Sequence, residues 1–497
     1  MKYDILIVGS GLGGLVCADI LSKEGLSICV VEKNKQAGGC LQSYKKHGCN
    51  FDVGVHYLGG LDEGQILNKF FKYLNIYNDL TLKKLDTDCF DLINYKNEDY
   101  LIAQGFSNFI EKLHAKFPNE KPALEKYIEQ LKKIQSSLSM FHEMKDDNYK
   151  FLFDNEFNTL GAYDFLNSIT QNKDLINVLS GNISLFAGKR EKTSLYLYGL
   201  ISYSYIESAY KIAGGSQQIA DLLIHEINKN GGKVLTNSEV IKFNSENDKL
   251  SSVLLSNGEV IEAETLISSI HPSLTLRMVD NKSIRKSFSN RINSLENSVS
   301  AFTIDVVFKD NSFKNLNYNY YHYNLDDLWD SPLVNESNWP NAFMFHIPAE
   351  KVETAYAKNL TILSFMPFDF VKKWENSTPE NRNQEYEDFK EKMAQKLLRK
   401  VDSLHPGFIN SIKRYNVSTP LTFRDFSGTI DGSLYGIMKD YQSPLSTFIH
   451  PRTKVPNLLL TGQNIAFHGV FGVIIGAILT CGELIGIKKI IKEINDV

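Results

Sequence analysis

The spacing of apolar and polar residues predicts a chain in which helices and strands follow one another throughout. The apolar run at 4–8 indicates a buried strand, and from Leu15 onward apolar residues recur at helical spacing. A second strand is expected at 27–31, and more strands are expected at 82–103. From 106 to 183 the spacing is mostly that of amphipathic helices. This mixture is typical of an α/β protein.

The middle of the chain predicts one helix followed by a group of strands. The helix is expected at 217–229, with Ser216 at its N-cap. The strands are expected at 233–235, 239–243, 252–255, 260–263 and 266–270. The pair Asn257-Gly258 between two of them is typical of a hairpin turn. His271, before Pro272, is expected to terminate the last of these strands.

The remainder of the chain predicts a second mixed segment and a closing helix. Between about 290 and 415 we expect a strand at 301–308 and a charged helix at 383–404. The apolar stretch at 470–487 approaches the length that spans a membrane, but it contains four glycines and Glu483. We interpret it as a buried helix that packs against a cofactor.

A glycine-rich turn directly follows the first apolar run and carries the candidate chemistry. Gly9 permits a tight turn, Gly11 lets a pyrophosphate approach bare backbone, and Gly14 lets the helix pack close to the strand. The helix N-terminus offers N–H groups and a positive dipole to phosphates. Glu32, after the second strand, is suited to bind ribose hydroxyls. Together these features predict a dinucleotide-binding βαβ unit.

Composition and charge exclude several other classes of protein. At 497 residues the chain is long enough for two domains, and its net charge of −4 gives no reason to expect a nucleic acid partner. The six cysteines form no C-x-x-C pair, so we expect neither a metal site nor a disulfide framework. Cys17 and Cys29, inside the predicted βαβ core, suit a reducing compartment. No signal peptide is expected before the first strand, and the protein is expected to be cytoplasmic.

Several further motifs resemble those of one enzyme family. They are Gly38-Gly39, Phe51-Asp52-Val53-Gly54, Gly214-Gly215-Ser216, Thr461-Gly462-Gln463 and the late segments at 419–424 and 432–436. With the opening glycine motif, they resemble the FAD-dependent phytoene desaturase-like oxidoreductases, a branch of the amine-oxidase flavoproteins. The continuation of the Phe51 motif through His56 and Tyr57 is most similar to the retinol saturase-like subgroup.

The resemblance implies a fold and a division into domains. It implies an α/β architecture in which a Rossmann-like FAD-binding domain with a parallel sheet carries an inserted mixed α+β substrate domain. The expected FAD-binding domain comprises 1–80, 205–290 and 415–497, and the expected substrate domain comprises 81–204 and 291–414.

The resemblance also implies which residues contact FAD. Gly9, Gly11, Gly13 and Gly14 would hold the pyrophosphate, and Glu32, followed by Lys33, would hold the adenosine ribose. The remaining expected contacts are Gly38 and Gly39 as a second cradle, Val240 at the adenine, Gly462, Gln463 and Asn464 at the ribityl and phosphate region, and Val473 at the pyrimidine edge of the flavin. Many relatives have an acid where this chain has Gln463-Asn464, a departure that bears on the flavin's potential.

The activity implied by the resemblance is hydride transfer between flavin N5 and a carbon–carbon double bond of an apolar polyene or isoprenoid lipid. The chain has a single dinucleotide fingerprint, so no second, dedicated NAD(P)H domain is expected. The reductant is either NAD(P)H that binds transiently or a separate electron donor. His56 is either a proton donor beside the flavin or a histidine held in a buried turn, and both interpretations remain open. A lipid substrate must be collected from a bilayer, which makes a peripheral membrane contact an open possibility.

Two alternative functions remain open on the sequence alone. A flavin amine oxidase would need an aromatic cage near the flavin. A flavin-free lipid-binding escort protein would resemble the GDP-dissociation inhibitors, which share the fold. The tyrosines at 318–323 are expected to fill a half-buried strand, with an aromatic lipid pocket as the other interpretation. The direction of the reaction and the oligomeric state stay undecided.

Overall fold

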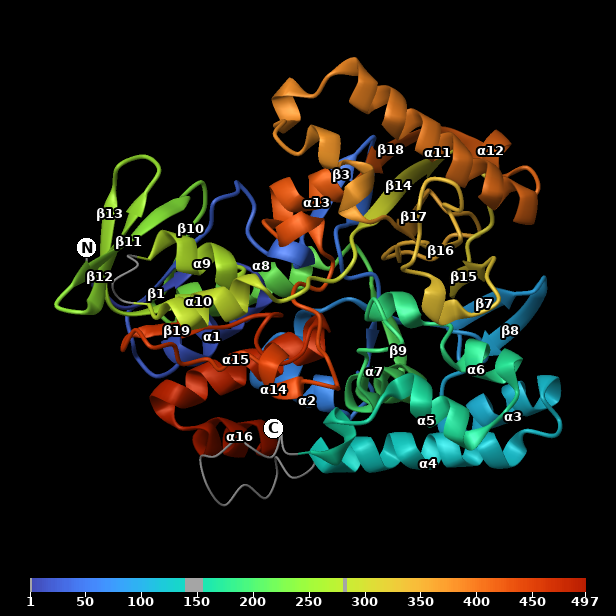
Figure 1. Ribbon diagram of the computed structural model, residues 1–497, viewed down its shortest axis with the longest axis horizontal. Coiled ribbons are helices and arrows are strands. Elements are labelled where there is room, and N and C mark those ends of the chain that lie inside the picture. The colour runs from blue at the N-terminus through green and yellow to red at the C-terminus, as the bar shows by residue number, and fades with distance from the viewer. Residues whose placement is uncertain (1, 139–154, 280–283) are drawn as a thin grey trace.

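Two seven-stranded sheets stand side by side in the computed structural model, which describes residues 2–138, 155–279 and 284–497 (Figure 1). The first sheet has the order β10-β2-β1-β13-β12-β11, with β19 pairing β13. Its strands are β10 (Lys233–Leu235), β2 (Ile28–Val31), β1 (Lys2–Val8), β13 (Val260–Ser268), β12 (Lys249–Leu255), β11 (Val240–Glu246) and β19 (Leu458–Leu460). The part from β10 to β13 with β19 is parallel, whereas β11, β12 and β13 are antiparallel, so the sheet is mixed.

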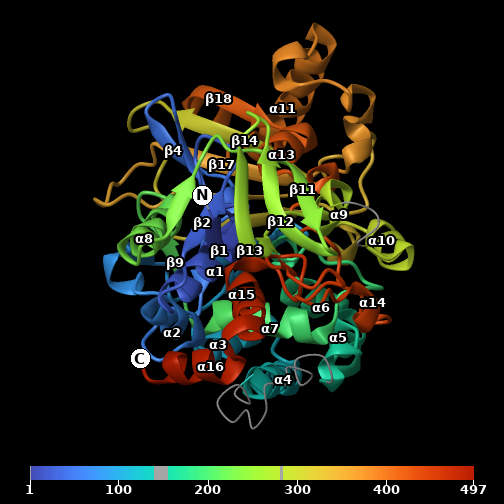
Figure 2. The same cartoon turned by 90° about the vertical axis from the view of Figure 1, so that its left-hand side faces the viewer.

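The central strands of this sheet are buried on both faces, as parallel strands usually are. Ile5 and Ile7 of β1 pack with the helices, while Leu6 and Val8 pack with the antiparallel strands β11 and β12. Because side chains alternate along a strand, one apolar run serves two cores. Figure 2 views the molecule with β1, β13 and β12 toward the reader and α15 below them.

Helices cover one face of the first sheet. The helices are α1 (Leu12–Ser22), α8 (Gln217–Lys229), α2 (Ile66–Tyr73), α15 (Gly469–Ile485) and α16 (Ile487–Asn495). The helix α1 contacts both α8 and α15, and all three contribute to the largest apolar core. Two short helices, α9 (Pro272–Met278) and α10 (Lys286–Asn293), follow β13.

The second sheet has the order β18-β14-β17-β16-β15-β7-β8 and is antiparallel except where β7 pairs β15. Its strands are β18 (Ile412–Ser418), β14 (Ala301–Phe308), β17 (Asn359–Phe365), β16 (Ala342–His346), β15 (Asn319–Tyr323), β7 (Asp91–Tyr95) and β8 (Glu98–Ile102). The helix α11 (Gln384–Leu404) covers one face, next to α12 (Phe408–Ser411). The helices α5 (Ala162–Ile169), α6 (Lys173–Leu179) and α7 (Leu195–Glu207) lie on the other, with α3 (Phe106–Lys116) and α4 (Lys121–Leu138) outside them (Figure 1).

Two small sheets and two short helices lie between these layers. One sheet pairs β3 (Ser43–Lys46) with β4 (Cys49–Asp52), and the other has the order β5-β9-β6. The strands of the latter are β5 (Leu58–Gly59), β9 (Ala209–Ile212) and β6 (Leu82–Lys84), and the helices are α13 (Pro420–Ser427) and α14 (Pro444–Thr447). The strand β9 therefore connects the helical layer to the Gly214-Gly215 motif, which places it between the two halves of the molecule.

Several expected elements have different bounds in the structure. The first helix begins at Leu12 rather than Leu15, because Gly11 is its N-cap. The strands expected at 260–263 and 266–270 are one strand, β13. The apolar stretch at 470–487 is two helices, since α15 ends at Gly486, whose φ of 85° departs from helical geometry. The strand containing Tyr320 and Tyr321 is fully buried rather than half-buried.

One expected helix cap is confirmed, and one expected strand end was wrong. Ser216 is the N-cap of α8, as expected, although its side chain makes no capping hydrogen bond. His271 does not end a strand, because β13 already ends at Ser268. It is the N-cap of α9, and its Nδ1 accepts a hydrogen bond from the N–H of Ser273 at 3.2 Å. The helical prediction over 139–154 lies outside the described residues.

We propose the domain division of 1–80, 205–290 and 415–497 against 81–204 and 291–414. It is supported by the first sheet, whose strands come from the first set of segments, and by the second sheet, whose strands come almost wholly from the other set. Among the described residues, the search for a helix that is both long and apolar enough to cross a bilayer finds none.

Candidate functional site

The turn between β1 and α1 is crowded at three of its glycines and open at the fourth. A Cβ on Gly14 would lie 2.1 Å from the carbonyl oxygen of Gly9, and one on Gly13 would lie 2.7 Å from the Cα of Gly462. Gly9 has a φ of 95°, which side chains rarely adopt. At Gly11 a Cβ would meet nothing nearer than the Ser269 hydroxyl at 3.9 Å. Gly11 is thus the one position of the four with open space beside its Cα.

A second glycine pair lies directly against Gly11. Gly11 and Gly38 form a parallel β-bridge, and a Cβ on Gly39 would lie 3.0 Å from the Cα of Gly11. The Gly38 N–H donates to the carbonyl of Ser10 at 3.1 Å and to its hydroxyl at 3.2 Å. Two stretches of bare backbone, far apart in sequence, therefore form one cradle.

Glu32 is buried next to this cradle and is held by backbone and hydroxyl donors. Its Oε2 accepts from the N–H and the hydroxyl of Ser10, at 3.1 and 2.7 Å, and its Oε1 accepts from the Asn34 N–H at 2.9 Å. A carboxylate has about four acceptor positions, so one remains for a ribose hydroxyl. Ser10 orients both Glu32 and Gly38, a role for which the sequence carries no signal because the motif leaves that position free.

The N-terminus of α15 meets the N-terminus of α1. Gly462 contacts Gly13, as described above, and the Val473 side chain would lie 3.4 Å from a Cβ on Gly13. His468 is the N-cap of α15 and makes no capping hydrogen bond with its side chain. The first N–H groups of a helix have no partner within the helix. Two positive helix ends therefore converge at the glycine cradle, an arrangement that favours a ligand carrying phosphates.

The other expected cofactor residues lie at different distances from this cradle. Val240 opens β11, two residues after Ser238, whose N–H donates to the Glu32 carbonyl at 2.8 Å. Lys33 points away, because its Nζ donates to the carbonyl of Asp425 at 3.1 Å. The Asn464 Oδ1 already accepts from the Ile437 N–H at 2.9 Å, so this oxygen is engaged by the protein. Gln463 follows Gly462 and lies near Gly436.

These observations fit an FAD cofactor. Bare backbone is available where a pyrophosphate would lie, a carboxylate with a spare acceptor position lies next to it, and two helix ends supply positive potential. The residues expected to contact the adenosine half of FAD form a more complete set than those expected to contact the flavin half. Among the residues that the structure describes, no group of three or more His, Cys, Asp or Glu side chains is placed to hold a metal ion.

The motif around Phe51 is joined to the Gly214-Gly215-Ser216 motif by Asp52. This carboxylate accepts from the N–H of Ser216 at 2.8 Å and from its hydroxyl at 3.1 Å. A Cβ on Gly54 would lie 3.2 Å from the Cβ of Cys40, next to Gly39. The segment that leads to His56 thus lies against the second glycine pair of the cradle.

His56 stacks on a second histidine that the sequence analysis did not identify. The ring centroids of His56 and His346 are 4.1 Å apart, with 30° between the planes. Burial, and then the neighbouring Lys211, lower the pKa of His56 to about 4. Burial, and then His56 and Lys211, lower the pKa of His346 well below its usual range. Both imidazoles are therefore neutral near pH 7.

Lys211 and Asp91 place two ionisable groups beside this pair. The Lys211 Nζ donates to the carbonyl of Ile347 at 3.0 Å, and Asp91 accepts from Asn319 and from the Tyr57 hydroxyl, each at 2.9 Å. Burial lowers the pKa of Lys211 to about 7 and raises that of Asp91 to about 7. Clusters of buried groups with strongly shifted pKa values are frequent at functional sites.

Tyr57 fixes the backbone next to His56. Its hydroxyl also pairs with the Tyr321 hydroxyl at 2.7 Å, and its carbonyl accepts from the Tyr205 hydroxyl at 3.2 Å. The Tyr57 and Tyr205 rings lie 4.6 Å apart, and Tyr435 lies 4.5 Å from the ring of His468 at the start of α15. Aromatic surfaces thus accompany the histidine pair.

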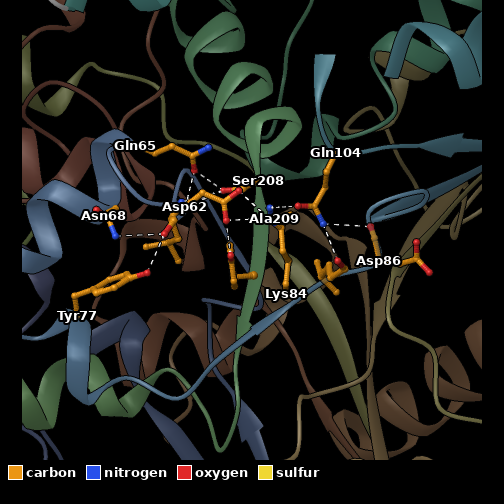
Figure 3. Close-up of polar contacts among 12 residues, drawn as sticks. Asp62, Gln65, Asn68, Tyr77, Lys84, Asp86, Gln104, Ser208 and Ala209 are labelled. Carbon is orange, nitrogen blue, oxygen red and sulfur yellow. Dashed lines mark hydrogen bonds and ion pairs between the residues drawn. The ribbon is translucent and has the colours of Figure 1, made fainter. Parts of the chain in front are cut away.

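A polar network holds the strand that carries Lys211. Figure 3 shows the Ser208 hydroxyl, which accepts from the Leu61 N–H at 3.0 Å and donates to Gln65. On the other side, the Ala209 N–H donates to Gln104, whose amide donates to the carbonyls of Leu85 and Asp86 at 2.8 and 3.2 Å. The strand β9 is therefore fixed between the segment that follows Tyr57 and the segment that leads to Asp91.

Comparisons with known proteins agree with this arrangement. The family model described as "Flavin containing amine oxidoreductase" matches residues 12–485. An all-trans-retinol 13,14-reductase of Danio rerio is 27% identical, over 97% of this chain and 86% of that protein. A chloroplastic prolycopene isomerase 2 of an Oncidium hybrid cultivar is 24% identical, over 88% and 76%. The solved structure of an oxidoreductase from Methanosarcina mazei, 17% identical, has a TM-score of 0.62 over 96% of this chain and 99% of that one.

Proposed function

Because the chain belongs to the family of flavin-containing amine oxidoreductases and is thus an FAD-dependent oxidoreductase, we propose that it acts on a carbon–carbon double bond of an apolar polyene or isoprenoid lipid. The observation that carries this proposal is the similarity, along nearly the whole chain, to a retinol reductase and to a prolycopene isomerase. Both names denote proteins that act on conjugated isoprenoids. FAD, when bound, supplies a hydride acceptor or donor at N5 of the flavin.

The charges next to His56 support a neutral lipid over an amine. A protonated amine would lie next to Lys211, whose own positive charge is already disfavoured by burial, so a second positive charge in the same low-dielectric region would be disfavoured as well. Asp91, the carboxyl group next to Lys211, already accepts two hydrogen bonds. An uncharged polyene carries no such penalty, and the rings of Tyr57 and Tyr205 suit its conjugated surface.

The proposed residue roles follow from the cradle and from the histidine pair. Gly9, Gly11, Gly13, Gly14, Gly38 and Gly39 hold the pyrophosphate region, and Gly462, Gln463, Asn464 and Val473 hold the flavin half. Glu32 holds the adenosine half together with Val240 and the backbone of Lys33, whose side chain points away. His56 supplies or relays the proton that accompanies hydride transfer. A neutral imidazole has one N–H and one lone pair, so it can give a proton at one nitrogen while it takes one at the other.

The proposal includes a transient reductant and a membrane contact. In the saturating direction the polyene would receive a hydride that originates from NAD(P)H, and His56 would supply the accompanying proton. The lipid is collected at a membrane surface. Leu160 and Leu445 are 47% and 73% exposed, and Leu445 lines a cavity whose other lining residues include Phe467, next to the N-cap of α15. Sedimentation with phosphatidylcholine vesicles, for the wild type and for Leu445→Asp, tests this contact.

The visible spectrum of the purified protein tests the function. Under anaerobic conditions, NADPH should bleach the yellow protein and all-trans-retinol or a carotenoid should restore the colour if the enzyme saturates its substrate. Bleaching by the polyene alone would establish the desaturating direction. Bleaching by amines and not by polyenes would replace the proposal with the amine oxidase alternative. A colourless protein that takes up no FAD would replace it with the lipid-binding escort.

A further inference from the structure

The stacked pair of His56 and His346 carries more unsatisfied polar atoms than any packing role explains. His346 ends β16 and is completely buried, yet neither of its ring nitrogens has a hydrogen-bond partner among the described residues. The Nδ1 of His56 is likewise buried without a partner in the described chain. Three polar nitrogens thus converge on one small region. Buried polar groups in native proteins nearly always have a partner, so a molecule with hydrogen-bonding capacity belongs here.

The chemistry of the two rings restricts what that molecule is. Both imidazoles are neutral, so together they offer N–H donors and lone pairs. A hydroxyl group donates one hydrogen bond and can accept two, so it matches this combination. An ammonium group has no acceptor and would face Lys211, which is buried next to the pair. A hydrocarbon would leave all three nitrogens unpaired.

The position of the pair connects it to the proposed reaction. His56 follows Gly54, which lies against Cys40 next to the Gly39 cradle, and His56 is half-buried while His346 lies behind it. Tyr57, held by Asp91 and Tyr321, keeps this segment in place. The two rings are in contact, with centroids 4.1 Å apart, so a group that binds the pair does so at the ring nitrogens, next to the segment that packs against the Gly39 cradle.

We propose that His56 and His346 form a subsite for the terminal hydroxyl of an isoprenoid alcohol, so that the enzyme selects hydroxyl-bearing polyenes over hydrocarbons of the same chain. This inference rests on the proposed function and narrows its substrate class. The hydroxyl makes hydrogen bonds with the ring nitrogens and forms no covalent bond. A site built to hydrogen-bond a hydroxyl discriminates strongly against an analogue that lacks it, because the polar groups of the site are then left unpaired.

The test compares two probes that differ only at the hydroxyl. They are all-trans-retinol and the hydrocarbon in which hydrogen replaces its hydroxyl group. Binding of each probe to the FAD-loaded protein is measured by perturbation of the flavin spectrum and by quenching of protein fluorescence, and kcat/KM is measured in parallel. The wild type should bind the alcohol at least about tenfold more tightly than the hydrocarbon.

The variant His346→Phe keeps an aromatic ring against His56 and removes both nitrogens. It should reduce the preference for the alcohol to about twofold or less, because the remaining imidazole makes only some of the hydrogen bonds that the hydroxyl group can form. His346→Gln restores a donor and an acceptor and should recover part of the preference. It also serves as the second variant if the phenylalanine is not tolerated in the fold.

A matched control is available on the neighbouring strand. His322 of β15 is also buried and also has one unpartnered ring nitrogen, but its ring packs on Phe343 rather than His56. His322→Phe should keep the preference of the wild type. An equal preference in the wild type and in His346→Phe, or no preference in the wild type, overturns the subsite. A yellow protein that binds neither probe contradicts the proposed function instead.

Discussion

Alanine substitutions at two glycines of the same turn should have different effects, one on FAD affinity and the other on the stability of the apoprotein. Gly11→Ala adds a Cβ whose nearest neighbour would be the Ser269 hydroxyl at 3.9 Å, at a residue with φ −63° and ψ 168°. Alanine adopts these dihedral angles readily. Gly14→Ala adds a Cβ 2.1 Å from the Gly9 carbonyl oxygen, more than 1 Å short of ordinary contact. The first change fills ligand space, and the second collides with the protein itself.

The magnitudes follow from these contacts. Gly11 is the N-cap of α1, where alanine in place of glycine costs the apoprotein about 1 kcal/mol at most. In the holoprotein the same Cβ displaces a phosphate from two backbone N–H groups, each charge-assisted bond being worth about 1.5–3 kcal/mol. The affinity for FAD should therefore fall by about 10²- to 10⁴-fold. Gly14→Ala overpacks the strand–helix contact, at a cost of about 1–3 kcal/mol or more to the apoprotein.

Urea unfolding of the apoprotein, followed by circular dichroism, and FAD titration, followed by flavin fluorescence, separate the two effects. Gly11→Ala should unfold close to the wild-type midpoint and bind FAD poorly. Gly14→Ala should unfold at clearly lower urea, whatever its cofactor affinity. Wild-type affinity in Gly11→Ala would refute the placement of the pyrophosphate at this residue. A wild-type midpoint in Gly14→Ala would refute the packing argument.

Three further changes test the reacting side and its support. His56→Phe should slow the reaction of the polyene with the flavin by about 10²-fold, without loss of bound FAD, in stopped-flow traces; an unchanged rate would remove His56 from proton transfer. Burial raises the pKa of Asp91 from 3.8 to about 7, so the folded state holds a proton that the unfolded chain releases, and stability falls as pH rises from about 4 to 7. Tyr57→Phe removes a hydrogen-bond donor to the Asp91 carboxylate, which should raise the pKa of Asp91 further and extend the loss of stability beyond pH 7. The urea midpoint of the variant should therefore lie further below that of the wild type at pH 8 than at pH 5. Lys439→Met leaves the carbonyls of Thr447, Asn464 and Ile465 without their ammonium donor and should cost about 3 kcal/mol of unfolding free energy, given about 1–3 kcal/mol for each buried unpaired group; Lys439→Arg should lose less.

The dinucleotide cradle could largely be predicted from the sequence, because backbone geometry produces it. A strand buried on both faces, a glycine turn and a helix leave a local pattern within about twenty residues. The bounds of α8 and α11 agree with the expected helices at 217–229 and 383–404, the latter to within one residue. Two of the errors, at Gly11 and Gly486, fall where a glycine decides a helix boundary. There the apolar pattern continues although the backbone geometry changes.

The histidine pair and its neighbours could not be predicted from the sequence in the same way. His56, Asp91, Lys211 and His346 come from four segments, and pairing among β5, β9, β6, β7, β15 and β16 brings them together. Sequence spacing carries no information on such pairing. The available signal was a charged residue inside each of two short apolar strands, Lys211 between Tyr210 and Ile212, and Asp91 before Leu92. A buried charge is uncommon enough to merit attention, but it does not name its partners.

The two halves of the site therefore differ in what evolution can change. The proposed contacts of FAD with the cradle depend on bare backbone at Gly11 and Gly39, where a side chain would occupy the space of the cofactor. This half of the site therefore determines which cofactor binds and says little about the substrate. The reacting half depends on side chains of residues such as His346 and Lys211, which a single substitution replaces without disturbing the first sheet. A shared fold consequently permits amine and polyene chemistry in different chains. In this chain the proposed preference for a neutral substrate depends on His56, His346 and Lys211, side chains that belong to the site rather than to the shared fold.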